Sequence, residues 1–134
     1  ANVTIEKMLS KLINPVGAKV AILGLTFKEN CPDLRGTKVF SVFQKLKQNK
    51  CDVSVTDPWA NKEEVLEKFN VKLKNIDQVK KQDAIIIAVA HKAYLEFEDK
   101  QWRSMLKEDG VIIDVKSIYN KSCFSNLNVE YWRL

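Results

Sequence analysis

The stretch that decides the fold is Asp83-Ala84-Ile85-Ile86-Ile87-Ala88-Val89-Ala90, in which one aspartate precedes an unbroken apolar run. Short runs rich in isoleucine and valine are typical of strands that are buried on both faces of a parallel sheet. This run is the longest apolar one in the chain, and it falls far short of the ~20 residues that a membrane-spanning helix needs. We therefore expect residues 83–90 to form a central strand, and we expect no membrane partner.

The segments on either side alternate between strand and helix patterns. Residues 18–25 form a second apolar run after Gly17, which predicts another buried strand. Further strands are predicted at residues 52–56, 111–115 and 129–132, with a short candidate at 71–73, and helices at 39–49, 61–69 and 97–106, with one or two helical turns at 76–80. The connections are too long for hairpins, so the strands should pair in parallel through right-handed crossovers. The predicted fold class is α/β, a three-layer α/β/α sandwich with a Rossmann-like, doubly wound, mainly parallel sheet.

The beginning of the chain has its own pattern. Apolar residues recur there at helical spacing, namely Val3, Ile5, Met8, Leu9, Leu12 and Ile13. They predict an amphipathic helix that ends near Asn14, because the residue before Pro15 avoids helical dihedral angles.

Length and charge narrow the class of protein. The 134 residues fit one domain, and 22 basic against 17 acidic residues give a net charge of +5, which favours anionic partners. The basic clusters at 45–50 and 72–81 lack the interleaved aromatic residues that stack on bases, so nucleic acid is not an expected partner. Three cysteines without a CxxC pair, and His91 as the lone histidine, predict no metal site and suit free thiols in the cytoplasm.

Ligands of open α/β sheets bind beyond the carboxyl ends of the strands. The residues predicted there are Thr26, Phe27, Lys28, Asp57, Pro58, His91, Lys116 and Ser117. Asp57 either makes a turn with the proline that follows it or binds a ribose, and the turn is favoured. His91 either faces the cleft or orients a loop through a backbone hydrogen bond, and the second is the commoner role.

The loop at 27–36 holds the candidate binding groups. The turn before it is not a dinucleotide-binding motif, since Gly24 is its only glycine at 24–29 where GxGxxG needs three. Two interpretations remain open. Phe27 covers a base or ribose while Lys28 or Arg35 binds phosphate, or the loop is structural and Asp33 pairs with Arg35.

Several motifs in this order resemble those of a known family. They are Val20-Ala21-Ile22-Leu23-Gly24-Leu25-Thr26-Phe27-Lys28, Asp33-Leu34-Arg35, Thr56-Asp57-Pro58, the 83–90 run and Asp114-Val115-Lys116. Together they are similar to the C-terminal, UDP-binding domain of the UDP-glucose/GDP-mannose dehydrogenase family. Three stretches resemble sequences of the branch that oxidises UDP-N-acetylhexosamines for capsule or O-antigen synthesis. They are residues 26–33, Asp57-Pro58-Trp59 and Ala88-Val89-Ala90-His91.

The resemblance implies a function. Members oxidise the sugar 6-hydroxyl to a carboxylate with two NAD⁺, and NAD and the catalytic cysteine belong to an N-terminal and a central region that this sequence lacks. Residues 1–16 would then be a connector helix from the missing part, and residues 17–134 the UDP-sugar-binding domain. The chain alone would be inactive, and the full-length protein would be a cytoplasmic homo-oligomer. The alternative is a stand-alone nucleotide-binding or regulatory module.

The resemblance also assigns residues. By position, Phe27 and Lys28 would contact the UDP-sugar, and Arg35 would reach toward NAD. Lys116 stands where relatives place a basic substrate contact, although some relatives have a pair of arginines there. Cys31 lies in the ligand loop, yet the family's catalytic cysteine belongs to the missing region, so we expect no catalytic residue and no metal ligand in this chain.

Overall fold

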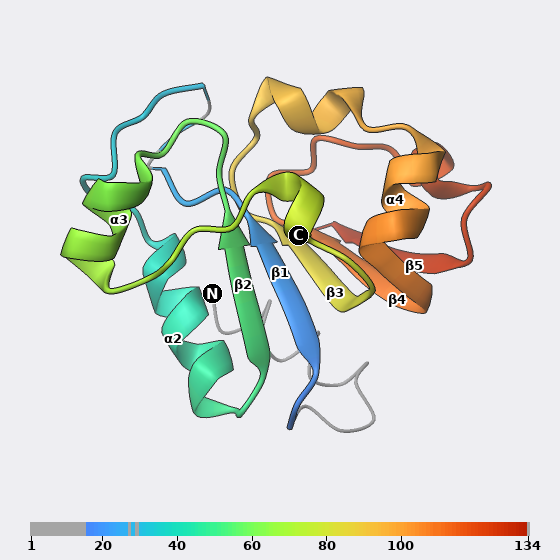
Figure 1. Ribbon diagram of the computed structural model, residues 1–134. Helices are drawn as coiled ribbons and strands as arrows, with labels where there is room; N and C mark the ends of the chain where they lie inside the picture. Colours follow the sequence, from blue (N-terminus) through green and yellow to red (C-terminus); the bar gives the residue numbers. More distant parts are fainter. Residues whose placement is uncertain (1–15, 27, 29, 134) are drawn as a thin grey trace.

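The computed structural model describes residues 16–26, 28 and 30–133, and the predicted first helix therefore lies outside the described residues. Five parallel strands form one sheet in the order β2-β1-β3-β4-β5 (Figure 1). The strands are β1 Lys19–Leu23, β2 Asp52–Thr56, β3 Gln82–Ile87, β4 Leu106–Asp114 and β5 Val129–Arg133. The helices are α2 Val39–Gln48, α3 Lys62–Phe69 and α4 Asp99–Met105, and the 3₁₀ turns are η1 Ile76–Gln78, η2 Lys92–Glu96 and η3 Lys121–Phe124.

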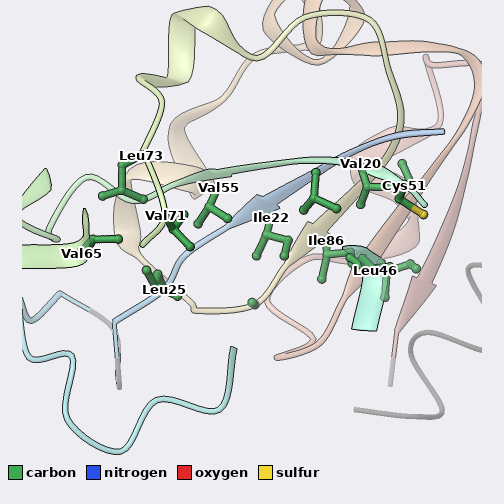
Figure 2. Packing of buried hydrophobic residues seen from close by; sticks show 14 of the residues in the cluster. Val20, Ile22, Leu25, Leu46, Cys51, Val55, Val65, Val71, Leu73 and Ile86 are labelled. Carbon is green, nitrogen blue, oxygen red and sulfur yellow. The ribbon is translucent and has the colours of Figure 1, made fainter. Parts of the chain in front are cut away.

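The two faces of the sheet bury separate cores, because neighbouring side chains of a strand point to opposite faces. Val20 and Ile22 of β1 pack into a cluster that α2 and α3 cover, and Figure 2 shows its packing. Ala21 and Leu23 of the same strand pack into a second cluster, which includes Trp102 and Met105 of α4. The predicted three-layer α/β/α sandwich with a parallel sheet is confirmed.

The helices carry recognisable end signals. Asn61 caps α3, since its side chain accepts a hydrogen bond from the N–H of Glu64 at 3.0 Å, and Asn70 ends the helix in the left-handed conformation that asparagine tolerates. Helix α4 is shorter than the predicted 97–106 segment, because η2 and a short extended stretch precede it.

Several strand predictions differ from the structure. No strand forms at 71–73, although Val71 and Leu73 are buried. The next residue, Lys74, donates its backbone N–H to the Val55 carbonyl of β2 at 2.9 Å. Strand β4 begins at Leu106 rather than 111, because Leu106 already pairs with Gln82 of β3, ahead of a register shift that precedes the Ala84–Val111 pair.

Strand β1 ends before the predicted residue 25 because Gly24 turns the chain sharply. Its φ is +102°, and a Cβ there would lie 2.6 Å from Cβ of Val89. Only glycine combines that conformation with so close an approach. The carboxyl ends of β1 and β3 are thereby held together at the edge where ligands are expected.

Candidate functional site

A pocket of about 380 Å³ opens at the carboxyl edge of the sheet. It is lined from the ends of β1, β3 and β4 by Thr26, Ala88, Val89, Val115 and Lys116, and from the beginning of α2 by Gly36, Thr37, Lys38, Val39 and Val42. Its walls are therefore apolar toward the sheet and polar at the rim. A pocket at this edge is where open parallel sheets bind ligands.

Two groups of positive charge border the pocket. Lys38 and Lys116 are exposed side chains in its lining. Helix α2 begins there without an acidic residue in its first turn, so the positive end of its dipole is not neutralised locally. Thr37 helps to define this end, because its hydroxyl oxygen accepts from the N–H of Val39 at 3.2 Å. The pocket is suited to an anion such as a phosphate.

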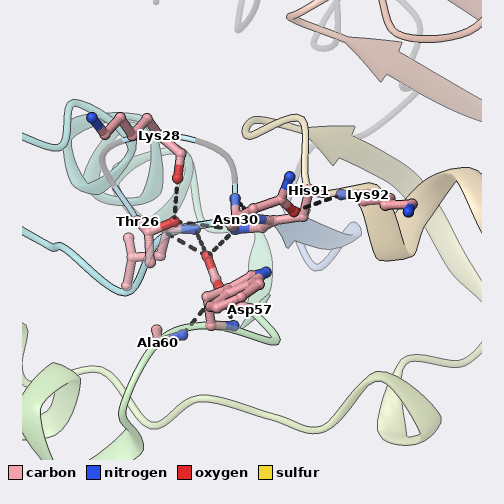
Figure 3. A network of polar contacts seen from close by, with 9 residues as sticks. Thr26, Lys28, Asn30, Asp57, Ala60, His91 and Lys92 are labelled. Atoms are coloured by element: carbon pink, nitrogen blue, oxygen red, sulfur yellow. Dashed lines mark hydrogen bonds and ion pairs between the residues drawn. The ribbon is translucent and has the colours of Figure 1, made fainter.

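Behind the pocket, Asp57 organises the ends of β1 and β2 (Figure 3). Its Oδ2 accepts hydrogen bonds from the N–H groups of Leu25 at 2.6 Å and Thr26 at 3.0 Å. Its Oδ1 accepts from the N–H groups of Trp59 at 2.7 Å and Ala60 at 3.1 Å, which is an Asx turn. The turn interpretation of Asp57 therefore agrees with the structure.

The pKa of the Asp57 carboxyl reflects two opposing effects. Burial alone would raise it, but hydrogen bonds from His91 and from the N–H groups of Leu25, Thr26 and Trp59 outweigh burial and hold the pKa below its ordinary value. The carboxylate is thus ionised at neutral pH and serves as a fixed internal anion.

His91 is completely buried against this carboxylate. Its Nδ1 lies 2.9 Å from the N–H of Asn30, which can only donate, so Nδ1 must accept. The ring proton is therefore on Nε2, which donates to Oδ2 of Asp57 at 2.9 Å and also lies 3.1 Å from the hydroxyl oxygen of Thr26. His91 is the neutral Nε2–H tautomer in this arrangement.

The predicted site residues fall into different environments. Lys116 lines the pocket. Lys28 is exposed and lies in the loop after β1, and its side chain points away from the polar network of Asp57 and His91 (Figure 3). Phe27 lies outside the described residues. Arg35 is 85% exposed and pairs with Asp33 through Nε at 3.0 Å and through its backbone N–H at 2.9 Å. The pairing that the structural interpretation of the loop expected is present.

A second buried carboxylate, that of Asp114 at the end of β4, organises the loop that carries Lys116. Oδ2 of Asp114 accepts from the N–H of Tyr119 at 2.9 Å and from the hydroxyl of Tyr131 at 2.6 Å. These bonds close the loop that carries Lys116 and so fix the position of its backbone.

Thr37 and Lys38 line the pocket but were not predicted as site residues. The signal was present, because both precede the first residue of a predicted helix that follows a strand and its loop, and such helix beginnings line the ligand crevice of α/β folds.

Other chemistry is not evident in the described ranges. Cys31 is half-buried, Cys51 buried and Cys123 exposed, and all three are free thiols. Among residues 16–26, 28 and 30–133, no group of three or more His, Cys, Asp or Glu residues could hold a metal ion. In the same part of the chain, no helix combines the length and apolar character needed to cross a membrane.

Comparisons with known proteins agree on one family. Residues 21–121 match the sequence model of the UDP-glucose/GDP-mannose dehydrogenase family, UDP binding domain. The chain is 38% identical to protein CapL of Staphylococcus aureus over all of its own length and 31% of that protein. It is also 38% identical to UDP-N-acetyl-D-glucosamine 6-dehydrogenase of Salmonella typhi, covering 85% of this chain and 27% of that protein.

A comparison with solved structures finds the same fold. The structure of NDP-N-acetyl-D-galactosaminuronic acid dehydrogenase from Methanosarcina mazei superimposes with a TM-score of 0.83 at 24% identity, over 98% of this chain and 27% of that one. This likeness supports the fold. The chain spans about a third or less of the length of the curated relatives.

Proposed function

The chain belongs to the UDP-glucose/GDP-mannose dehydrogenase family, as its UDP-binding domain, and on that premise we propose that it binds the UDP part of a UDP-N-acetylhexosamine for an NAD-dependent 6-dehydrogenase. The observation that carries the proposal is the pocket at the carboxyl edge, with Lys116, Lys38 and the beginning of α2 around an apolar floor. The N-acetylhexosamine comes from the relatives named for such sugars.

The diphosphate would lie among the cations of this edge. Lys28 and Lys116 would each make a charge-assisted hydrogen bond to a phosphate oxygen, which is worth about 1.5–3 kcal/mol. The N–H groups at the beginning of α2 and the ammonium of Lys38 would add to the positive potential. Phe27 would contact the nucleoside or sugar, as the family resemblance implies.

The turn after β1 does not fit the pyrophosphate of NAD. The N–H groups of Leu25 and Thr26, which would face a phosphate in a dinucleotide site, already donate to the Asp57 carboxylate. We therefore propose that another part of the full-length protein, which would be a homo-oligomer in the cytoplasm, binds NAD. Arg35, whose guanidinium is exposed, is the residue of this chain proposed to reach toward it, and residues 1–16 would connect the parts.

Calorimetric titration tests the binding function. UDP should bind the chain, and uridine should bind more weakly because it lacks the diphosphate. No heat from UDP, or equal affinity for UDP and uridine, would contradict the proposal.

A second assay tests the division of labour. The chain mixed with NAD⁺ and UDP-N-acetylglucosamine should produce no NADH, because the proposed cofactor site and nucleophile lie elsewhere. A rise in absorbance from NADH would show that this chain itself carries catalysis.

A further inference from the structure

Three loops of the binding edge meet at His91. Its Nε2 donates to Asp57 in the loop after β2, its Nδ1 accepts from Asn30 in the loop after β1, and its own backbone belongs to the loop after β3. In return, Oδ1 of Asn30 accepts from the N–H of Lys92 at 3.0 Å. Asn30 is thus tied to the 91–92 segment by two hydrogen bonds, one in which it donates and one in which it accepts.

The backbone of Lys28 lies between two of these ties. On one side, the hydroxyl of Thr26 donates to the Lys28 carbonyl at 3.2 Å and also lies against Nε2 of His91. On the other side, Asn30 adopts a left-handed φ of 54°, a conformation that asparagine tolerates but that a fixed contact must select. The imidazole supplies that contact through Nδ1.

We infer that His91 is a positioning residue for the binding site, and that its neutral Nε2–H form holds Thr26 and Asn30 so that Lys28 meets the ligand diphosphate. The inference rests on the proposed UDP-binding function. His91 does not act on the ligand directly, because its side chain has no exposed surface and both ring nitrogens have partners inside the protein.

The contact with Asn30 requires an unprotonated Nδ1. A proton on Nδ1 would place two donors opposite each other, and the Asn30 N–H would lose its acceptor.

Two substitutions distinguish the contribution of Nδ1 from that of Nε2. In His91→Asn, the amide oxygen can take the place of Nδ1 and keep the Asn30 contact. In His91→Gln, the amide nitrogen can take the place of Nε2 and keep the Asp57 contact only. We expect His91→Gln to weaken UDP binding about tenfold, as loss of one hydrogen bond of the loop implies, whereas His91→Asn should bind UDP within about twofold of the wild type.

Nuclear magnetic resonance supplies readouts that do not depend on the ligand. Because His91 is the only histidine, its ring nitrogens give one unambiguous pair of ¹⁵N signals, and Nδ1 should be the unprotonated nitrogen. The amide of Asn30 should be protected from hydrogen exchange in the wild type and in His91→Asn, and should exchange faster in His91→Gln.

A proton on Nδ1 at neutral pH, or unchanged UDP affinity in His91→Gln despite a rapidly exchanging Asn30 amide, would overturn the inference. Failure of the wild type to bind UDP would instead contradict the proposed function.

Discussion

Nε2 of His91 donates to Oδ2 of Asp57 across 2.9 Å, and both side chains are fully enclosed although 34 residues separate them in the chain. The same carboxylate accepts four backbone N–H groups, from Leu25, Thr26, Trp59 and Ala60. A single buried anion therefore joins the ends of three neighbouring strands. The binding edge depends on this pair for its shape, because Asp57 and His91 each link the loops that follow β1, β2 and β3.

The first prediction concerns Asp57→Asn. The amide places a nitrogen donor among groups that can only donate, so buried N–H groups are left without an acceptor, each costing about 1–3 kcal/mol. We expect the free energy of unfolding at pH 7 to fall by more than about 2 kcal/mol, measured by urea denaturation. As a control, Asp52→Asn changes an exposed carboxyl at the beginning of β2 and should cost little.

Acid should reduce the difference between wild type and Asp57→Asn. The pKa of Asp57 is lower in the folded protein than its ordinary value of 3.8, so its stabilisation is complete above about pH 5 and is lost as the pH falls through 3.8 toward the folded pKa. The variant lacks this titration. A difference in stability that stays constant from pH 7 to pH 3 would show that the carboxylate charge contributes nothing.

The second prediction compares three exposed lysines. Lys28→Ala and Lys116→Ala should each weaken UDP binding by about tenfold to a hundredfold, because each removes one charge-assisted hydrogen bond. Lys100→Ala, on α4 and away from the pocket, should bind UDP as the wild type does. Thermal melting should be nearly unchanged in all three, since exposed ion pairs contribute little to stability. An equal loss in Lys100→Ala would mean that only net charge matters.

The fold was largely predictable from the sequence, and the reason is burial. Ile85, Ile86 and Ile87 alternate between two cores, so a continuous apolar run is the expected signature of β3. The beginning of β4 was missed because Lys107, Glu108 and Asp109 are exposed and have no apolar pattern. The strand prediction at 71–73 was wrong because burial of apolar residues alone does not produce hydrogen bonds to a neighbouring strand.

The binding edge was predictable in location but not in detail. Parallel topology requires Thr26, Asp57, His91 and Lys116 to lie near one edge, and they do. Which of them touch depends on side-chain rotamers and on a left-handed Asn30, and neither has a sequence periodicity. For the same reason, the sequence left two interpretations of the 27–36 loop open, and the Asp33–Arg35 pair belonged to one of them.

The third prediction contrasts two cysteines. Cys51 lies in the apolar cluster next to Leu46, and burial raises the pKa of its thiol, so it should react slowly with a maleimide. Cys51→Ser should cost about 1–3 kcal/mol, because a hydroxyl replaces an apolar group in the core. Cys31, half-buried in the ligand loop, should react faster, and Cys31→Ser should preserve both the melting temperature and UDP affinity. Complete loss of UDP binding in Cys31→Ser with an intact fold would give this thiol a function.

The last prediction uses Gly24 and Gly17 as a matched pair. Both have positive φ, at 102° and 81°, but a Cβ at Gly17 would meet no atom within 4 Å, whereas one at Gly24 would lie 2.6 Å from Cβ of Val89 and 2.9 Å from its backbone nitrogen. Gly17→Ala should therefore cost only conformational strain, about 1 kcal/mol. Gly24→Ala adds a steric clash that a shift of the backbone must relieve. We therefore expect this substitution to lower the free energy of unfolding by more than about 3 kcal/mol in total.

The same clash should reach the binding edge. Moving Gly24 away from Val89 displaces Leu25 and Thr26, whose N–H groups donate to Asp57, so Gly24→Ala should also weaken UDP binding while Gly17→Ala leaves it unchanged. Urea denaturation and UDP titration of both variants measure the two effects side by side. Equal stability of the two variants would mean that the ends of β1 and β3 can separate freely, and that the close approach of Gly24 to Val89 does not shape the site.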